Sequence, residues 1–254
     1  NCQDKDIKRV ARSSNAASSS TRFVFTLTAP QAIRLIALVN TNASRSTKYR
    51  MKWANDSTFT DLRADTGWVD MYPVGTVPYG SFEWEEEGFW DGRPNTEQIA
   101  YYPRDLICVF AQNHWGQYLS VEIDDATNVS GYFQFGRLFI GKGFSPKFNV
   151  SYGRSISHNS ATTVQETLSR REIFDVRPLV RTEVIDLDHL DQGEGSTLFD
   201  MERQLDVAGE LFYVLNASDQ VNLSRTSFLG RMERLTALSQ PYFGVYKKPI
   251  QIKE

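Results

Sequence analysis

The chain has 254 residues and a formal net charge of −3, and 41% of its residues are hydrophobic, 13% aromatic and 23% charged. This is the composition of a folded globular protein, and it excludes disorder along the whole chain. The sequence has no long run of lysine and arginine, so we expect no nucleic-acid partner. The length allows one large domain or two moderate ones.

The cysteines and the apolar segments exclude further classes. Cys2 and Cys108 are the two cysteines, and their wide separation predicts neither a metal site nor a disulfide framework. We expect Cys108 to lie in a buried strand. No window reaches the roughly 18 apolar residues that a membrane span needs, and the first residues lack the apolar core of a secretion signal. We therefore expect no membrane insertion.

The first strand patterns follow a polar lead-in segment, residues 1–21. Phe23, Phe25 and Leu27 alternate with smaller side chains in a segment that predicts a strand stopping at Pro30. Apolar residues then occupy both faces of residues 32–44, which is typical of a strand covered on both sides.

A half-buried strand is predicted at residues 47–56, because Tyr49, Met51 and Trp53 share one face and three basic residues share the other. Residues 70–104 have no sustained period and are rich in glycine, proline and tryptophan. They predict a long irregular insertion on the surface.

Regular patterns resume after the insertion. Residues 105–112 and 117–124 predict strands, and the polar loop Asp125 to Gly131 predicts a hairpin with the strand that follows. That strand carries three phenylalanines on one face and further apolar residues on the other. We expect these phenylalanines to belong to the core and not to a ligand surface: Phe133, Phe135 and Phe139.

Residues 150–254 predict a second, β-rich domain with one helix. Strand patterns lie around 164–168 and 180–187, and three segments near the end predict closing strands. Between them, Leu198, Met201, Leu205 and Ala208 have helical spacing, and we expect Ser196 to cap that helix and Gly209 to end it. The predicted fold is therefore mostly β, with residues 22–149 forming a β-sandwich domain.

Catalytic and metal-binding motifs are weak. The three histidines have no ligand spacing, and the acidic residues Asp186, Asp188, Asp191 and Glu194 depart from a calcium-loop order, so we predict a solvated turn. Paired carboxylates beside tryptophan suit a glycosidase, but the acidic cluster of the insertion is explained more simply as a solvated loop. We predict no enzyme, no cofactor and no metal. The cluster consists of Glu83, Glu85, Glu86, Glu87 and Asp91.

Aromatic residues in loops carry the strongest functional signal, because a large exposed ring is costly unless a partner covers it. They predict an interface with another protein, with packing onto their own domain and sugar binding as the alternatives. The candidate contact residues are Trp84, Trp90, Tyr101, Tyr102 and Trp115.

Scattered positions in residues 22–149 resemble tail proteins of long-tailed bacteriophages that carry a galactose-binding-like, jelly-roll β-sandwich. The match begins in the segment ALVNTN and continues through a YR strand, a GW turn and the late segment GYFQFGRLFIG. Thr41 and Thr66 depart from that pattern, and residues 150–254 resemble the same proteins more loosely. The matching positions are Asn40, Asn42, Tyr49, Arg50, Gly67, Trp68, Pro73, Asp124, Asn128, Gly131, Tyr132, Gly136, Arg137 and Gly141.

The resemblance implies a structural virion component at the tail tip or baseplate, assembled in the cytoplasm of the bacterial host. Its partners would be other tail or baseplate proteins and further copies of itself in a homo-oligomeric ring. Some relatives of this sandwich bind carbohydrate, so a module that binds a host-surface glycan is the alternative. Fold kinship alone does not transfer that activity.

Overall fold

The computed structural model describes residues 8–254 and is mostly β, with antiparallel strands and three helices in the described part. Cys2 lies outside the described residues. The chain divides into two compact units: the first extends to Gly143 and includes Val214–Ser227, and the second contains Phe144–Tyr213 and Phe228–Glu254. The division thus falls slightly before the expected boundary at 149/150, and a short segment from the expected second domain belongs to the first unit.

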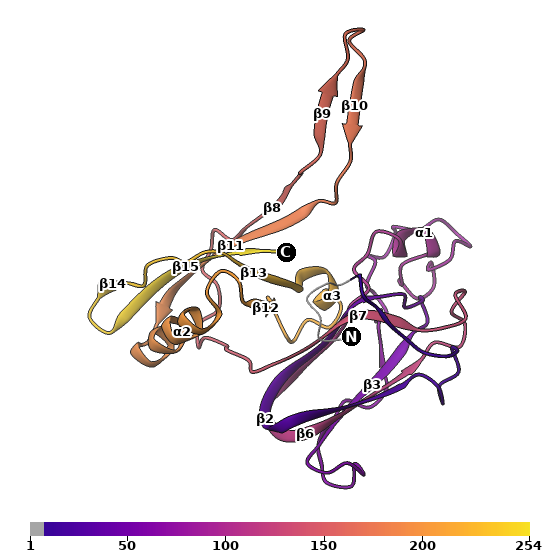
Figure 1. Ribbon diagram of the computed structural model, residues 1–254, viewed down its shortest axis with the longest axis horizontal. Coiled ribbons are helices and arrows are strands. Elements are labelled where there is room, and N and C mark those ends of the chain that lie inside the picture. The colour runs from indigo at the N-terminus through magenta and orange to yellow at the C-terminus, as the bar shows by residue number, and fades with distance from the viewer. Residues whose placement is uncertain (1–7) are drawn as a thin grey trace. The chain divides into compact units, whose positions relative to one another are not determined.

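The first unit is built on one seven-stranded antiparallel sheet (Figure 1). Two of its strands are unusually long, since β2 spans Arg22–Thr41 and β6 spans Leu106–Asp124. In sheet order the strands are β1 (Ala11–Arg12), β7 (Gln134–Gly141), β2, β6, β3 (Lys48–Ala54) and β4 (Leu62–Asp65), with β5 (Val69–Asp70) also beside β3.

The predicted stop at Pro30 is wrong, because β2 continues through it. Proline has no backbone N–H for the ladder, and the pairing of β2 with β6 shifts register between Thr26 and Gln31, around that position. A second register shift lies between Ile33 and Leu35. Phe23, Phe25 and Ile33 pack on the core before this second shift, and Ile36 and Leu38 do so after it, so the inward-facing positions of β2 change there. A local irregularity therefore replaces the expected break between two strands.

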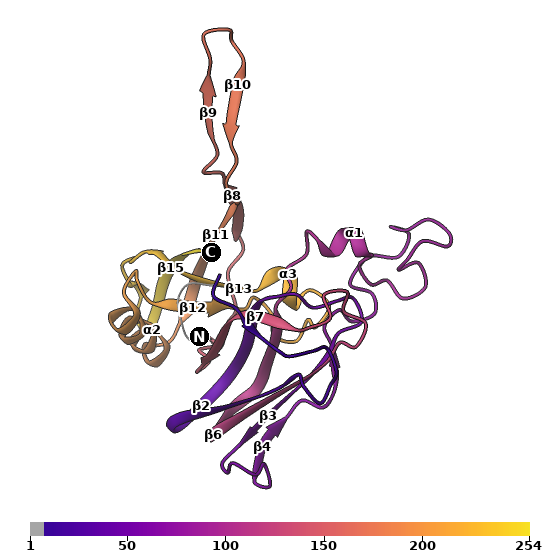
Figure 2. The ribbon, with the colours of Figure 1, turned by 45° about the vertical axis from the view of Figure 1, so that its right-hand side comes forward.

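The sheet folds over its own core, as the turning course of β2 and β6 in Figures 1 and 2 shows. Phe23 from the first half of β2 meets the ring of Phe135 in β7, with centroids 5.1 Å apart. Trp53, Met51 and Val121, from β3 and β6, belong to the same cluster. This confirms a sandwich-like, mostly-β fold, formed here by two halves of one sheet.

The predicted hairpin between β6 and β7 is wrong. Strand β7 pairs with β2 and β1, so β2 lies between β7 and β6. The polar loop at 125–131 therefore connects strands that are not neighbours in the sheet. The core predictions are confirmed for Phe133 and Phe135, which are fully buried, and for Cys108, which is buried in β6. Phe139 is half-buried.

The second unit has a six-stranded antiparallel sheet and one long helix. A separate hairpin of β9 (Thr163–Glu166) and β10 (Glu172–Asp175) extends beyond the end of β8 in both views (Figures 1 and 2). The sheet order is β12 (Glu210–Tyr213), β13 (Phe228–Arg234), β15 (Val245–Lys253), β11 (Val180–Leu190) and β8 (Ser155–Asn159), with β14 (Ser239–Tyr242) also beside β15.

Helix α2 spans Gln192–Leu205 and starts earlier than expected. Its N-cap is Asp191, which forms a capping box with Glu194, so Ser196 is not the cap. The helix ends at the C-cap Asp206, before the expected stop at Gly209. The predicted acidic turn is therefore wrong, because Asp186 and Asp188 lie in β11, Asp191 caps α2 and Glu194 lies in its first turn.

Two short helices lie in the first unit, α1 at Thr96–Ile99 and α3 at Leu223–Thr226. The expectation of one helix in residues 150–254 is therefore incomplete, since α3 also falls in that range. In the described part of the chain, no helix has the length and apolar character that crossing a membrane would require.

Candidate interaction site

The insertion, residues 71–105 between β5 and β6, contains α1 as its only regular element. Backbone hydrogen bonds nevertheless join distant parts of the insertion to each other. The backbone N–H of Gly75 donates to the carbonyl of Asp91 at 3.1 Å, and that of Val77 donates to the carbonyl of Gly92 at 2.7 Å. These hydrogen bonds bring the two sides of the loop together. Phe82 and Val77 are buried within it, so the loop has a small core of its own.

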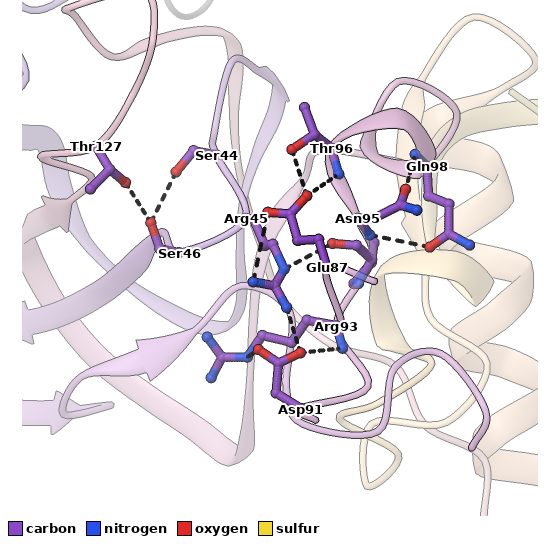
Figure 3. Close-up of polar contacts among 11 residues, drawn as sticks. Ser44, Arg45, Ser46, Glu87, Asp91, Arg93, Asn95, Thr96, Gln98 and Thr127 are labelled. Carbon is purple, nitrogen blue, oxygen red and sulfur yellow. Dashed lines mark hydrogen bonds and ion pairs between the residues drawn. The ribbon is translucent and has the colours of Figure 1, made fainter. Parts of the chain in front are cut away.

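Arg45 ties the insertion to the loop after β2. Its guanidinium contacts Asp91 at 2.5 Å and Glu87 at 3.8 Å, and its Nε donates to the carbonyl of Pro94 at 3.1 Å (Figure 3). Arg93 adds a second tie, because it contacts Asp70 of β5 at 2.8 Å. Half-buried ion pairs with several hydrogen bonds fix geometry better than single exposed pairs do.

Glu87 also holds the start of α1. Its carboxylate accepts hydrogen bonds from the hydroxyl and the backbone N–H of Thr96, at 2.8 and 2.9 Å (Figure 3). The hydrogen bond from the Thr96 hydroxyl lowers the pKa of Glu87 below its ordinary value most, and the bond from the Thr96 backbone N–H lowers it further. The helix is closed by a capping box between Asn95 and Gln98. Glu87 is thus a structural carboxylate that stays ionised.

The anchored insertion carries a cluster of three aromatic rings, Trp84, Phe89 and Trp90, which we call the ring cluster. Their centroids lie 5.0–5.4 Å apart: Trp84 to Phe89 5.3 Å, Trp84 to Trp90 5.4 Å and Phe89 to Trp90 5.0 Å. Each pair meets edge to face, which is a favourable aromatic geometry. Trp84 is nevertheless 67% exposed and Trp90 78% exposed. Phe89 is half-buried, and its contacts hold the two tryptophans in place while most of their surface stays open.

Several glutamates lie beside the ring-cluster residues in the sequence. Glu83, Glu85 and Glu86 are exposed and make no ion pair with any residue that the structure describes. Glu86 and Glu87 also line an open depression of about 300 Å³ beside α1. The surface thus combines aromatic faces with uncompensated negative charge, which suits a cationic partner.

The other predicted contact residues do not join the ring cluster. Tyr102 packs edge to face on Tyr72 and lies under the guanidinium of Arg225, 5.1 Å from its ring centroid. It therefore packs within its own unit. Tyr101 follows α1 and is almost fully exposed, and Trp115 is exposed on β6. The described residues show no ring contact between these two and Trp84 or Trp90.

Several residues that match the phage tail protein pattern make hydrogen bonds that stabilise the fold. The side chain of Asn42 donates to the carbonyl of Tyr132 at 2.9 Å and accepts from the backbone N–H of Gln134 at 2.8 Å. Asn128 donates to the carbonyl of Asn42 at 2.9 Å. Two distant loops are thus joined by amide side chains. Tyr49 is buried, which raises its pKa, and its hydroxyl donates to the carbonyl of Ile107 at 2.7 Å.

The candidate site also contains residues that the sequence patterns did not identify. Arg45 lies far from Asp91 along the chain, and no local pattern announces their contact. Phe89 lay between the two predicted tryptophans, and the N-T-E-Q sequence before Ile99 is a capping-box signal that would have located α1. In the part of the chain that the structure describes, no group of three or more potential metal ligands comes together.

Comparisons with known proteins do not place this arrangement in a family. No protein-family model matches the chain, and no curated protein or solved structure gives a significant match. The resemblance to phage tail proteins therefore stays a prediction from the sequence.

Proposed function

We propose that this chain is a structural subunit of a multi-protein assembly and that its ring cluster is the contact surface for a neighbouring protein. The observation that carries the proposal is the pair of exposed tryptophans, Trp84 and Trp90, on an insertion that ion pairs hold in place. The resemblance seen in the sequence suggests the setting, the tail tip or baseplate of a long-tailed bacteriophage.

Physical arguments favour a protein partner. Exposed tryptophans carry a large apolar area, and residues of this type supply much of the affinity at protein interfaces. Binding also costs less when the contact residues are already ordered. Arg45 and Glu87 order the insertion, and the edge-to-face contacts order the rings. The cluster therefore has two properties of an interface anchor, exposed apolar area and a fixed geometry.

Sugar binding, the alternative, receives less support from the ring geometry. A sugar ring stacks on the flat face of an aromatic side chain, and a continuous surface would need rings that are close to coplanar. The planes of Trp84 and Trp90 meet at 70°. Glu87 is unsuited to be the general acid of a glycosidase, because that role needs a raised pKa and the pKa of Glu87 is lowered by its hydrogen bonds to Thr96.

Quantification of the chain in purified tails tests the proposal. We expect this chain in a fixed ratio to the tail-tube subunit. We expect the variant Trp84→Ala with Trp90→Ala to fold but to enter tails several-fold less. Trp68→Ala is the matched control, since Trp68 is half exposed and lies outside the ring cluster. Absence of the chain from tails, or equal incorporation of the double variant, would overturn the proposal.

A further inference from the structure

The hairpin of the second unit has no packing partner among the described residues. We call residues 160–179, which include β9 and β10, the arm. All of its residues except Thr162 and Thr167 are exposed, and Figures 1 and 2 both show it extending away from the sheet of its own unit. It exposes a series of apolar side chains: Val164, Leu168, Ile173, Phe174, Val176 and Leu179.

Such an arm is weakly stabilised by itself. An isolated two-stranded hairpin is marginally stable in water. Val164 lies directly opposite Phe174 on one face, but the next pair on that face is Glu166 opposite Glu172. Like charges that lie opposite each other across two strands are destabilising. Few contacts within the arm therefore stabilise its extended form, and a partner that covers the arm would add stabilising contacts.

The tip of the arm is basic. It closes with a bond from the backbone N–H of Thr167 to the carbonyl of Arg171 at 2.9 Å, and the Thr167 hydroxyl donates to the same carbonyl at 3.0 Å. These bonds use backbone groups of Arg171 and leave its guanidinium unused. The guanidinium groups of Arg170 and Arg171 are exposed and pair with no carboxylate among residues 8–254.

The ring cluster offers the complementary chemistry. Arginine stacks on indole faces and pairs with carboxylates at the same time. Glu83, Glu85 and Glu86 provide unpaired carboxylates, and Trp84 and Trp90 provide exposed indole faces. One chain thus carries both a free basic tip and an acidic, aromatic surface with no cationic partner of its own.

We propose that the arm of one copy of this chain docks, through Arg170 and Arg171, on the ring cluster of a second copy. The proposal rests on the proposed function and deepens it, since it names the partner of the same surface. The two surfaces differ, so the contact is head to tail, and each copy then offers one free surface to the next. Contacts of this kind close into a ring or continue as a filament.

Sedimentation velocity of the full chain tests this. We expect wild-type chain to self-associate, and we expect Arg170→Glu with Arg171→Glu to weaken association about tenfold or more. Glu85→Lys with Glu86→Lys should have a similar effect. Mixing these two variants should restore association, because the unchanged arm of the second variant then meets the unchanged ring cluster of the first. Lys142→Glu with Arg203→Glu is the control with equal charge change at exposed sites.

The outcomes separate the inference from the proposed function. A monomeric wild type, unaffected association of the arm variant, or two folded variants that do not associate when mixed would each overturn the docking inference. The proposed function survives these results if Trp84→Ala with Trp90→Ala still lowers incorporation into tails, which would identify a different protein as the partner. If that variant enters tails normally, the proposed function itself fails.

Discussion

The insertion and the arm both expose apolar side chains, but they are held in different ways. The insertion is pinned by Arg45 and Arg93 to elements outside it and has a small buried core around Phe82. The arm is held by its cross-strand pairs and by the pairing of β8 with β11 at its base. The insertion is therefore ordered without a partner, whereas we expect the arm to gain order from the partner that we propose for it.

This difference suggests two roles in one contact. A pre-ordered surface loses little entropy on binding, and a weakly held segment can adapt to it. The insertion and the arm should also respond differently to mutation. Substitutions in the insertion disturb a structure that is already formed, whereas substitutions in the arm disturb only the bound state. The following predictions test that contrast, from the largest expected effect to the smallest.

Gly88→Ala should disrupt the insertion most. Gly88 has φ of +101°, and a Cβ there would lie 2.5 Å from the carbonyl oxygen of Arg93 and 2.9 Å from the ring of Phe82. We expect a local cost of about 3 kcal/mol, from backbone strain and overpacking together. Hydrogen exchange of the amides in residues 75–92 measures it. Gly153→Ala, near the base of the arm, is the matched control.

Gly153 has a similar φ of +107°, but no atom lies within 4 Å of a Cβ built there. It should therefore show only the strain of the backbone, about 1 kcal/mol. Equal effects at the two glycines would mean that the insertion is packed no more closely than the arm base.

Arg45→Ala should loosen the insertion by about 1–2 kcal/mol, because it removes the contacts with Asp91, Glu87 and the carbonyl of Pro94. Limited proteolysis should then cut within residues 80–95 while the first sheet stays intact. Arg63→Ala removes only an exposed pair with Asp61 and should change cleavage little. Protection equal to wild type in Arg45→Ala would show that the ion pairs do not order the loop.

Acid should loosen the insertion less than Arg45→Ala does. The folded-state pKa of Glu87 is lower than its ordinary value of 4.5, so the stabilisation is fully present above that value and is lost as the pH falls through the folded-state pKa. Hydrogen exchange of the Thr96 amide, compared between wild type and Glu87→Gln, measures this. The acid sensitivity should be smaller in Glu87→Gln, and identical profiles would contradict the assignment.

Removal of the arm should change stability least. A chain in which a short glycine-serine turn replaces residues 162–176 keeps β8 and its pairing with β11. Since the arm shields no buried residue, the free energy of unfolding of the second unit should stay within about 1 kcal/mol of wild type. Urea denaturation checks this. A larger loss would show that the arm supports its own unit and would weaken the case for an external partner.

The sequence predicted individual strands better than their pairing. The alternation of Tyr49, Met51 and Trp53 identified β3 correctly, and all three side chains are buried. Pro30 was misread because periodicity cannot show that a strand continues through a register shift. The hairpin of β6 and β7 was wrong for a similar reason, since a polar loop does not reveal that β2 separates the two strands.

The candidate site was located in part. Trp84 and Trp90 were singled out, because tryptophan in an aperiodic segment is informative by itself. Their contacts with each other and with Phe89, and the anchoring by Arg45, depend on packing that no local pattern encodes. Within the arm only a strand around residues 164–168 was predicted, β10 was missed, and nothing in the sequence distinguished an exposed strand from a buried one.

Oxidative footprinting of the tryptophans tests the central claim, contact through the ring cluster, most directly. Oxidation rates would be compared between the free chain and the chain in purified phage tails, the assembly in which we propose it resides, with Trp68 as the internal reference because it is exposed and lies outside the cluster. Contact through the ring cluster predicts several-fold protection of Trp84 and Trp90 in tails and an unchanged rate at Trp68. Equal oxidation of Trp84 and Trp90 in the two states would contradict it.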